Sequence, residues 1–161
     1  MSNFSGPGVY MVIPTNAKEM CLDVWGGGSN PGAPVRLDYN GMDRENQIWE
    51  VVAAGGDRGC PEVGVQDRQY HLLAVNSGLM LCAPVEGEMT GCVVATRSVR
   101  DPSTRWKISP AGNEAYYITS MAGTNLALSV QAGRRGRGED LVVSPKVAQP
   151  YFQFELKTPP F

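Results

Sequence analysis

The sequence predicts an all-β domain built from three similar copies of one four-strand unit. Strand-like segments recur in the same order three times, and each copy ends in an aromatic residue. The 19 glycines and 12 prolines in 161 residues are typical of a fold with many turns and few helices. No long segment places apolar residues at helical spacing, and a chain of this length can bury a core as one domain. We therefore expect a single domain over residues 1–161.

Four strands are expected in each copy, in a constant order. The first strand carries aromatic residues and is expected at residues 8–13, 69–74 and 115–119. The second and third strands alternate apolar and polar residues, which predicts one buried face. The second strands carry Met20/Leu22/Val24, Leu79/Leu81/Ala83 and Leu126/Leu128/Val130, the third carry Val35/Leu37, Val93/Ala95 and Leu141/Val143, and the fourth carry Trp49, Trp106 and Phe154. The copies are expected to span approximately residues 8–52, 68–109 and 114–157.

Nearly constant spacing connects the second strand of each copy to its closing aromatic residue. The separations are 27 positions from Leu22 to Trp49, 25 from Leu81 to Trp106 and 26 from Leu128 to Phe154. Three copies of four strands specify a β-trefoil, in which three hairpins cap a six-stranded barrel. The closing aromatics are then predicted to lie in the core, where burial of each contributes roughly 1.5–3 kcal/mol. Segment 53–62 interrupts the period and is predicted to be an inserted surface loop.

Charge and hydropathy exclude several classes of function. The formal net charge is -2, so no overall attraction to nucleic acid or to an anionic membrane is expected. The longest apolar run is far too short to cross a bilayer, and residues 1–8 lack the basic and apolar regions of a secretory signal. We therefore expect a cytoplasmic protein with no membrane insertion and no nucleic-acid partner.

The cysteines and the single histidine do not form a recognisable metal-binding pattern. Cys21, Cys60, Cys82 and Cys92 have spacings that match no zinc site, and His71 alone cannot build a usual one. No metal, cofactor or catalytic residue is predicted, and we do not expect an enzyme. A reducing compartment favours free thiols, although Cys82 and Cys92 could pair in an oxidising medium.

The segment Gln47-Ile48-Trp49 resembles the Q-x-W signature of ricin B-type lectins, a β-trefoil family. Residues 31–36 and 101–108 resemble the subgroup of cytoplasmic ascomycete agglutinins of the Sclerotinia type. This resemblance covers nearly the whole chain. It implies a homodimeric lectin that binds galactose and N-acetylgalactosamine through one site in its first repeat, and it suggests a role in fungal defence. The copies that end in Trp106 and Phe154 keep the core aromatic but lack the glutamine of the signature.

A sugar site must bind two kinds of surface on a pyranose ring. Vicinal hydroxyls suit a carboxylate or an amide, and the apolar C–H face suits an aromatic ring. In ricin-type sites these groups come from an Asp after the second strand, an aromatic after the third and an Asn before the Gln of Q-x-W. Asp23, on the outward side of its strand, and Asn46 match two of these positions. Gln47 matches the residue that orients the nearby loop.

The stacking position of the resembled site falls on Asp38, which departs from the family pattern. The ring is therefore expected from the adjacent Tyr39 or from Trp25 on the loop opposite. Arg36 projects outward and could donate to a sugar hydroxyl or steady Asp23. In the other two copies, Asp23 corresponds to Cys82 and Ser129, Asn46 to Ser103 and Tyr151, and Asp38 to Thr96 and Ser144. Because no carboxylate or amide is kept there, we predict one site for galactosyl or N-acetylgalactosaminyl glycans, in the first copy.

Other interpretations stay open. Asp23 and Asn46 could each be a turn-forming residue that bonds only to backbone. The β-trefoil also hosts protease inhibitors that act through an exposed loop, and residues 55–65 are a candidate for such a loop. The basic segment 133–138 is interpreted as a solvated loop and not as a phosphate site, because no strand-to-helix context follows it. Scattered surface charges are expected at Arg97, Arg100 and Arg105.

Overall fold

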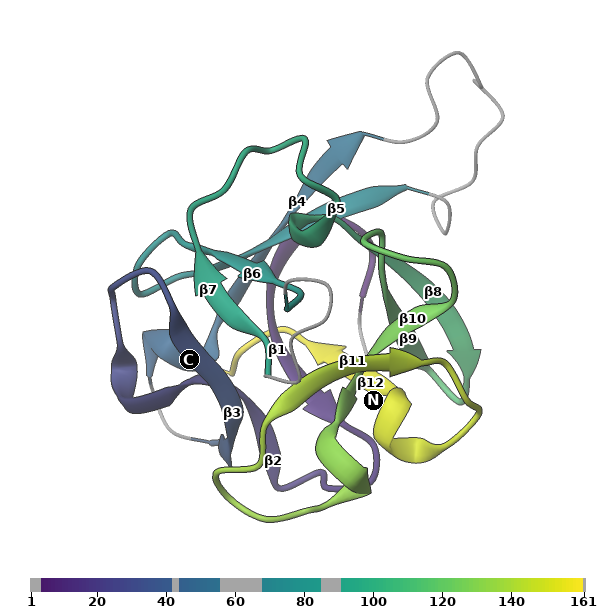
Figure 1. The fold of residues 1–161 in the computed structure, drawn as a ribbon. Coiled ribbons are helices and arrows are strands. Elements are labelled where there is room, and N and C mark those ends of the chain that lie inside the picture. Colours follow the sequence, from purple (N-terminus) through teal and green to yellow (C-terminus); the bar gives the residue numbers. More distant parts are fainter. Residues whose placement is uncertain (1–3, 42–43, 56–67, 85–90, 161) are drawn as a thin grey trace.

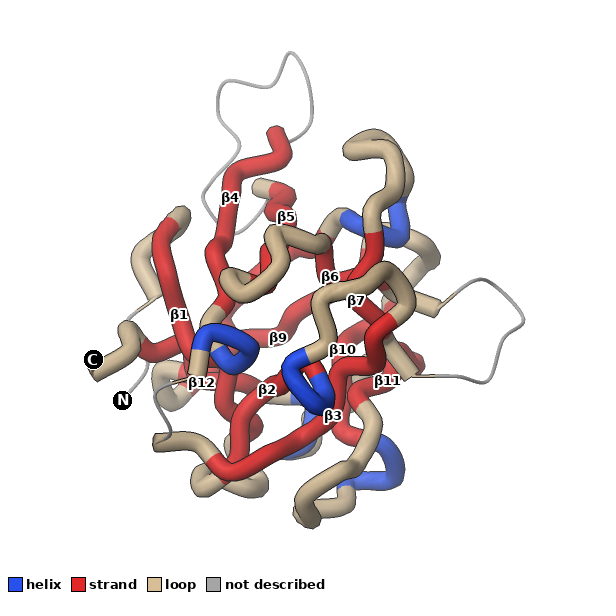
Figure 2. The backbone as a smooth tube through the Cα atoms, turned by 90° about the vertical axis from the view of Figure 1, so that its left-hand side faces the viewer, coloured by secondary structure: helices blue, strands red, loops and turns tan. Residues whose placement is uncertain are grey.

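The computed structural model describes residues 4–41, 44–55, 68–84 and 91–160, and these contain twelve strands and five short 3-10 helices. The strands of the first repeat are β1 (Gly8–Pro14), β2 (Met20–Val24), β3 (Ala33–Tyr39) and β4 (Trp49–Gly55). Those of the second are β5 (Gln69–Ala74), β6 (Met80–Cys82), β7 (Val93–Ala95) and β8 (Trp106–Gly112). Those of the third are β9 (Ala115–Ser120), β10 (Leu126–Val130), β11 (Leu141–Pro145) and β12 (Phe154–Lys157). Strands dominate the chain, and helical turns are short (Figure 2).

Six strands form a closed barrel. Strand β1 pairs with β12 and β4, β5 pairs with β4 and β8, and β9 pairs with β8 and β12, all antiparallel. Because the ring closes on itself, none of the six is an exposed edge strand along its paired residues. Each repeat contributes its first and last strand, so no repeat can build the barrel alone.

The remaining six strands form three hairpins, β2–β3, β6–β7 and β10–β11. Strand β3 pairs with β7 at Ala33 and Val94, and an isolated bridge joins Arg36 of β3 to Asp140, just before β11. The three hairpins therefore meet one another, and segments far apart in sequence lie side by side (Figure 1). Six barrel strands and three hairpins confirm the predicted all-β class and the β-trefoil.

The three closing aromatics lie in the core, as predicted. Trp49, Trp106 and Phe154 are all 0% exposed. Trp49 Nε1 donates to the carbonyl of Leu22 at 3.2 Å, and Trp106 Nε1 donates to the carbonyl of Leu81 at 3.1 Å. The spacing seen in the sequence thus corresponds, in two repeats, to a hydrogen bond between the closing indole and the second strand. Phenylalanine has no N–H, so the third repeat keeps the packing without this bond.

Short 3-10 turns also repeat around the threefold arrangement. They are η2 (Glu45–Gln47), η4 (Pro102–Thr104) and η6 (Pro150–Phe152) before the closing aromatics, and η1 (Trp25–Gly27) and η5 (Gln131–Gly133) after β2 and β10. Gly26 and Gly27 in η1 have φ values of 70° and 68°. This left-handed conformation carries no steric penalty for glycine. The turns η1 and η2 supply the walls of the site described below.

In the third strand of the second repeat, the residue that faces the core differs from the prediction by one position. Val94 is 0% exposed, whereas Val93 and Ala95 are half-buried on the opposite face. Because side chains alternate along a strand, a shift of one residue exchanges its two faces. By its pairing with β6, the residue that corresponds to Asp38 is Ala95 and not Thr96.

Two arginines predicted to be scattered surface charges bind specific backbone and side-chain groups. Arg105 donates to the Gln69 side chain at 2.6 Å, to the carbonyl of Val99 at 2.9 Å and to the carbonyl of Ala54. Arg97 makes two further hydrogen bonds within the second repeat. These side chains therefore tie strands β4, β5 and the loop before β8 together, which sequence position alone did not indicate.

The predicted insertion after the first repeat begins later than expected, because β4 continues to Gly55. Residues 56–67 lie outside the described part of the chain, and they include Cys60 and most of the candidate inhibitor loop.

Cys21, Cys82 and Cys92 are buried and free, so Cys82 and Cys92 form no disulfide here. Across the described residues, no helix is long and apolar enough to cross a membrane.

Candidate functional site

A cavity of about 420 Å³ opens beside the first repeat. It is lined by Asp23, Trp25, Gly26, Gly27, Asp38, Arg44, Asn46 and Arg137. All but one of these residues come from η1, η2 and the β2–β3 hairpin or the segments next to them. Arg137 comes from the loop between η5 and β11, in the third repeat. A volume of this size falls in the range of pockets for small ligands.

Asp23 is the buried carboxylate of this cavity. Its neighbours Leu22 and Val24 are 0% exposed in the core, so Asp23 points to the other face of β2. That face is covered, and Asp23 is only 1% exposed, which corrects the simple expectation of an outward-facing side chain. Gln47 Nε2 donates to Asp23 Oδ2 at 3.0 Å. The second oxygen, Oδ1, accepts no well-formed hydrogen bond from any described residue.

Burial raises the pKa of the Asp23 carboxyl from its ordinary value of 3.8 to about 6. The hydrogen bond from Gln47 lowers this pKa, the neighbouring Asp38 carboxylate raises it, and Arg44 and the nearby Asn46 amide lower it. Desolvation is the largest of these effects, because a charged carboxylate loses favourable hydration when it is buried. Asp23 is therefore ionised above neutral pH and becomes protonated as the pH falls through about 6.

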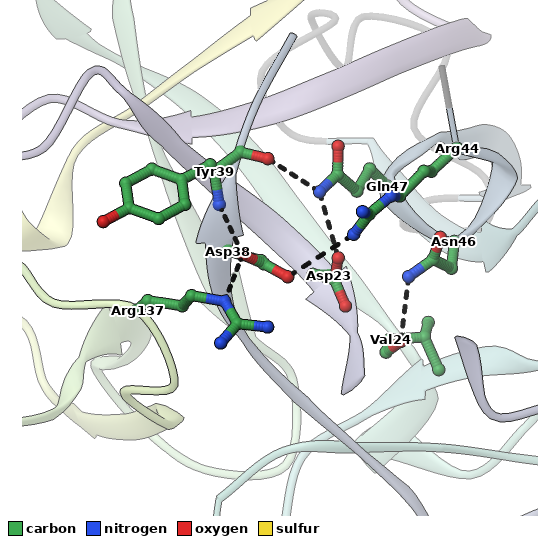
Figure 3. A network of polar contacts seen from close by, with 8 residues as sticks. All are labelled: Asp23, Val24, Asp38, Tyr39, Arg44, Asn46, Gln47 and Arg137. Atoms are coloured by element: carbon green, nitrogen blue, oxygen red, sulfur yellow. Dashed lines mark hydrogen bonds and ion pairs between the residues drawn. The ribbon is translucent and has the colours of Figure 1, made fainter. Parts of the chain in front are cut away.

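Gln47 holds the two sides of the site together. It is 0% exposed, and its Nε2 donates both to Asp23 and to the carbonyl of Tyr39, the latter at 2.9 Å (Figure 3). One amide thus links η2 to β2 and to the end of β3. Asn46 lines the cavity and donates its Nδ2 to the carbonyl of Val24 at 3.1 Å. These contacts lie where the sequence placed the loop-orienting amide and its neighbour.

Asp38 occupies the position where an aromatic ring was expected, and its carboxylate forms ion pairs with two arginines. It is 6% exposed and its Oδ1 accepts from Arg137 Nε and from the Tyr39 amide, both at 2.8 Å. Arg44 Nη1 lies 3.7 Å from Asp38 Oδ2. The Tyr39 ring is 54% exposed and points away from Asp23 (Figure 3), and it does not line the cavity. The structure therefore does not bring Tyr39 to the site as a stacking ring.

Trp25 lines the cavity, but its ring already contacts cations. The guanidinium carbons of Arg36 and Arg137 lie 5.6 and 5.1 Å from the centroid of its ring, within the range of cation–π interactions. Arg36 is paired with Asp23 across β2 and β3, but no described hydrogen bond or ion pair joins the two side chains. Its Nε donates to Asp140 at 2.9 Å, because the β3 edge faces the third repeat, and Arg36 does not line the cavity.

Sequence reasoning missed two arginines of this site. Arg137 lies in the segment interpreted as a solvated loop, yet it contacts Asp38 and Trp25 of the first repeat. No pattern in the sequence links the two segments, since their contact arises only when the repeats close on each other. Arg44 stands two positions before Asn46 in the same loop, so its proximity to the site could have been inferred from position alone.

The matched places in the other repeats hold different groups. Cys82 donates through its thiol to the carbonyl of Met80 at 3.3 Å. In the third repeat, the hydroxyls of Ser129 and Ser144 lie 3.1 Å apart, and the Tyr151 ring packs against Gly133. Among the residues that the structure describes, neither place has a carboxylate beside a side-chain amide, which is the pair that Asp23 and Gln47 form in the first repeat.

A β-trefoil with a polar cavity, a buried carboxylate, orienting amides and an indole defines a protein of the carbohydrate-binding class. The model of the ricin-type beta-trefoil lectin domain-like family matches residues 45–144. This range contains Asn46, Gln47 and Arg137, and it begins after Asp23. The chain is also 33% identical over 120 residues to the agglutinin of Sclerotinia sclerotiorum, a match that covers 71% of this chain and 70% of that protein. The chain belongs to the ricin B-type lectin family.

Solved structures agree with this fold. The Rhizoctonia solani agglutinin superimposes with a TM-score of 0.76 and 16% identity, covering 98% of this chain and 99% of that one. A ricin B-like lectin of Macrolepiota procera, solved in complex with lactose, superimposes with a TM-score of 0.71 and 15% identity, covering 98% and 100%. The predicted resemblance is confirmed at the level of the family, as is the expectation of a carbohydrate-binding lectin and not an enzyme.

Proposed function

We propose that this lectin binds terminal galactose or N-acetylgalactosamine through one site per chain, the cavity around Asp23. The observation that carries the proposal is the buried Asp23 carboxylate. One of its oxygens is occupied by Gln47 at 3.0 Å, and the other has no well-formed hydrogen bond from a described residue. A buried oxygen of this kind requires a donor, and a sugar hydroxyl in the cavity supplies one.

The chemistry of the cavity favours a sugar over other small ligands. Asp23 accepts hydroxyl protons through charged hydrogen bonds, and the Asn46 side chain both donates and accepts. Trp25 offers an apolar edge beside these polar groups. Galactose presents vicinal hydroxyls and a continuous C–H face, and lactose, bound by the Macrolepiota lectin, ends in galactose. These features support a galactoside as the ligand.

The weak affinity expected of a single shallow site argues for a dimer. A single monosaccharide site of this type binds near ~1 mM, which is about -4 kcal/mol. Agglutination needs two sites in one particle, because linked sites raise the avidity without any new contact. We therefore propose a homodimer, located in the cytoplasm and acting in fungal defence. A preparation that sedimentation shows to be strictly monomeric should fail to agglutinate cells.

The test is a titration of lactose and N-acetylgalactosamine by calorimetry, together with a glycan array. Asp23→Ala should weaken binding at least about tenfold, since it removes a charged acceptor of hydroxyl protons. Ser129→Ala, at the matched position of the third repeat, is the control and should leave the affinity within about twofold. The wild-type stoichiometry should be one sugar per chain. Unchanged affinity in Asp23→Ala would refute this site assignment.

The same preparation separates the lectin from the inhibitor alternative. Most of the candidate inhibitor loop lies outside the described residues. Inhibition of serine or cysteine proteases by the wild-type chain, combined with an empty glycan array, would favour the inhibitor.

A further inference from the structure

We propose that Arg137 and Arg44 form an anion-binding subsite at the mouth of the cavity, so that the lectin prefers galactosides that carry a sulfate or a carboxylate. The inference rests on the proposed function, because it names the substituent that the same site recognises beside the sugar hydroxyls. Four observations support it: unused donors, guanidinium groups that are more exposed than the carboxylates, a fixed orientation and a shared cavity.

Both arginines have donors to spare. Arg137 uses Nε to bind Asp38 at 2.8 Å, and no described residue accepts a hydrogen bond from its two terminal nitrogens. Arg44 approaches Asp38 at 3.7 Å, which is an ion pair beyond hydrogen-bond distance. Their side chains are 56% and 46% exposed, so a ligand at the mouth can reach them. The terminal nitrogens of Arg137 are turned away from Asp38 (Figure 3).

The charged groups that line the cavity are unequally exposed. Two guanidinium groups, of Arg44 and Arg137, and two carboxylates, of Asp23 and Asp38, are among the described lining residues. Asp23 and Asp38 are only 1% and 6% exposed, whereas the side chains of Arg44 and Arg137 are 46% and 56% exposed. An anionic group that enters the mouth from solvent therefore meets the guanidinium groups before the carboxylates.

Arg137 is held in one orientation before a ligand arrives. Its Nε is bonded to Asp38, and its guanidinium carbon lies 5.1 Å from the centroid of the Trp25 ring. A planar guanidinium fixed in this way presents two terminal nitrogens to an oxyanion, with little further loss of side-chain freedom. Such charged hydrogen bonds to sulfate or carboxylate are stronger than those to a neutral hydroxyl. The subsite lies in the same cavity as Asp23, so one ligand can contact both.

The experiment compares lactose with 3′-sulfolactose, 6′-sulfolactose and 6′-sialyllactose by calorimetry at pH 7.5, in low and in moderate salt. At least one anionic sugar should bind about tenfold more tightly than lactose, a gain of one charged hydrogen bond. The advantage should shrink as salt rises, because the two guanidinium groups are partly exposed. The two sulfated sugars and the sialylated sugar distinguish sulfate from carboxylate as the preferred group.

Arg137→Gln should reduce the anionic advantage to less than about threefold while lactose still binds. Arg137→Lys keeps the charge and loses the planar fork, so it should keep part of the advantage. The matched control is Arg135→Ala, in the same exposed loop but outside the cavity lining, which should leave the advantage intact. Thermal melting of each variant shows whether it is folded.

Each other outcome overturns the inference. If no anionic sugar binds more tightly than lactose, the subsite is wrong although the proposed function stands. If Arg137→Gln weakens lactose and the anionic sugars equally, Arg137 acts only by positioning the site. If the folded wild-type lectin binds none of the four sugars, the proposed function fails together with the inference.

Discussion

Replacing Asp23 by asparagine measures what a buried carboxylate costs this fold. Asparagine has the same shape and its carbonyl oxygen can still accept from Gln47 Nε2, which lies 3.0 Å from the aspartate oxygen. The pKa of the folded carboxyl is about 6 against an ordinary value of 3.8, a rise of roughly two units. Each unit corresponds to about 1.4 kcal/mol. Keeping Asp23 ionised therefore costs the folded state roughly 2–3 kcal/mol at pH 8.

The direction of the pKa shift determines the pH range in which the two proteins differ in stability. Because the pKa is raised on folding, the favourable contribution of protonated Asp23 is fully present below about pH 4 and is lost as pH rises through about 6. The asparagine variant does not titrate at this position. The unfolding free energy of Asp23→Asn minus that of the wild type should therefore rise by roughly 2–3 kcal/mol between pH 4 and pH 8. Burial of the new amide adds a cost that does not depend on pH. It changes the size of the difference in unfolding free energy but not its dependence on pH.

The assay is urea unfolding of both proteins at pH 4, 5, 6, 7 and 8, followed by tryptophan fluorescence. A difference that stays flat across this range would refute the raised pKa and the burial that causes it. The same substitution should abolish most of the sugar affinity at pH 7.5, and wild-type binding should weaken below about pH 6 as Asp23 becomes protonated. A stability gain together with a loss of binding would show that the carboxylate is kept for the ligand.

Further predictions concern two side chains that hold loops and strands in place, Gln47 within the first repeat and Arg105 between the first and second repeats. Gln47→Ala removes the donor to Asp23 and should weaken sugar binding about tenfold and lower the unfolding free energy by about 1–2 kcal/mol, measured by calorimetry and urea unfolding. Thr104→Ala, in the matched turn of the second repeat, should leave the affinity unchanged. Arg105→Ala should lower the unfolding free energy by about 2 kcal/mol, since it removes the donor to the carbonyls of Ala54 in β4 and of Val99 in the loop before β8. It should not alter sugar binding, and an affinity loss would contradict the separation of the two repeats.

Local patterns explain why so much of the fold was predictable. Alternation gave the strands, and the recurring distance from the second strand to Trp49 and Trp106 reflects an indole hydrogen bond that each repeat makes within itself. The prediction chose the wrong face for the third strand of the second repeat, because Val93, Val94 and Ala95 are all apolar enough to face inward. Only pairing with β6 selects Val94.

Of the candidate site, the sequence predicted only the residues that belong to a single repeat. Asp23, Asn46 and Gln47 lie in a single repeat, at separations set by one hairpin and one turn, so their spacing indicated their proximity. Side-chain direction was not encoded in that spacing. Tyr39 was an equal candidate to Trp25, and the structure turns its ring toward solvent.

By itself, the sequence determined the threefold fold, the core aromatics and the repeat that carries the carboxylate and its amides. The tertiary structure decided that Asp23 is buried, that Arg36 turns to Asp140, and that Arg137 completes the cavity. The two arginine contacts share one physical cause. A single repeat cannot bury its own apolar face, so the barrel closes by bringing different repeats together, and contacts across that closure have no fixed separation along the chain.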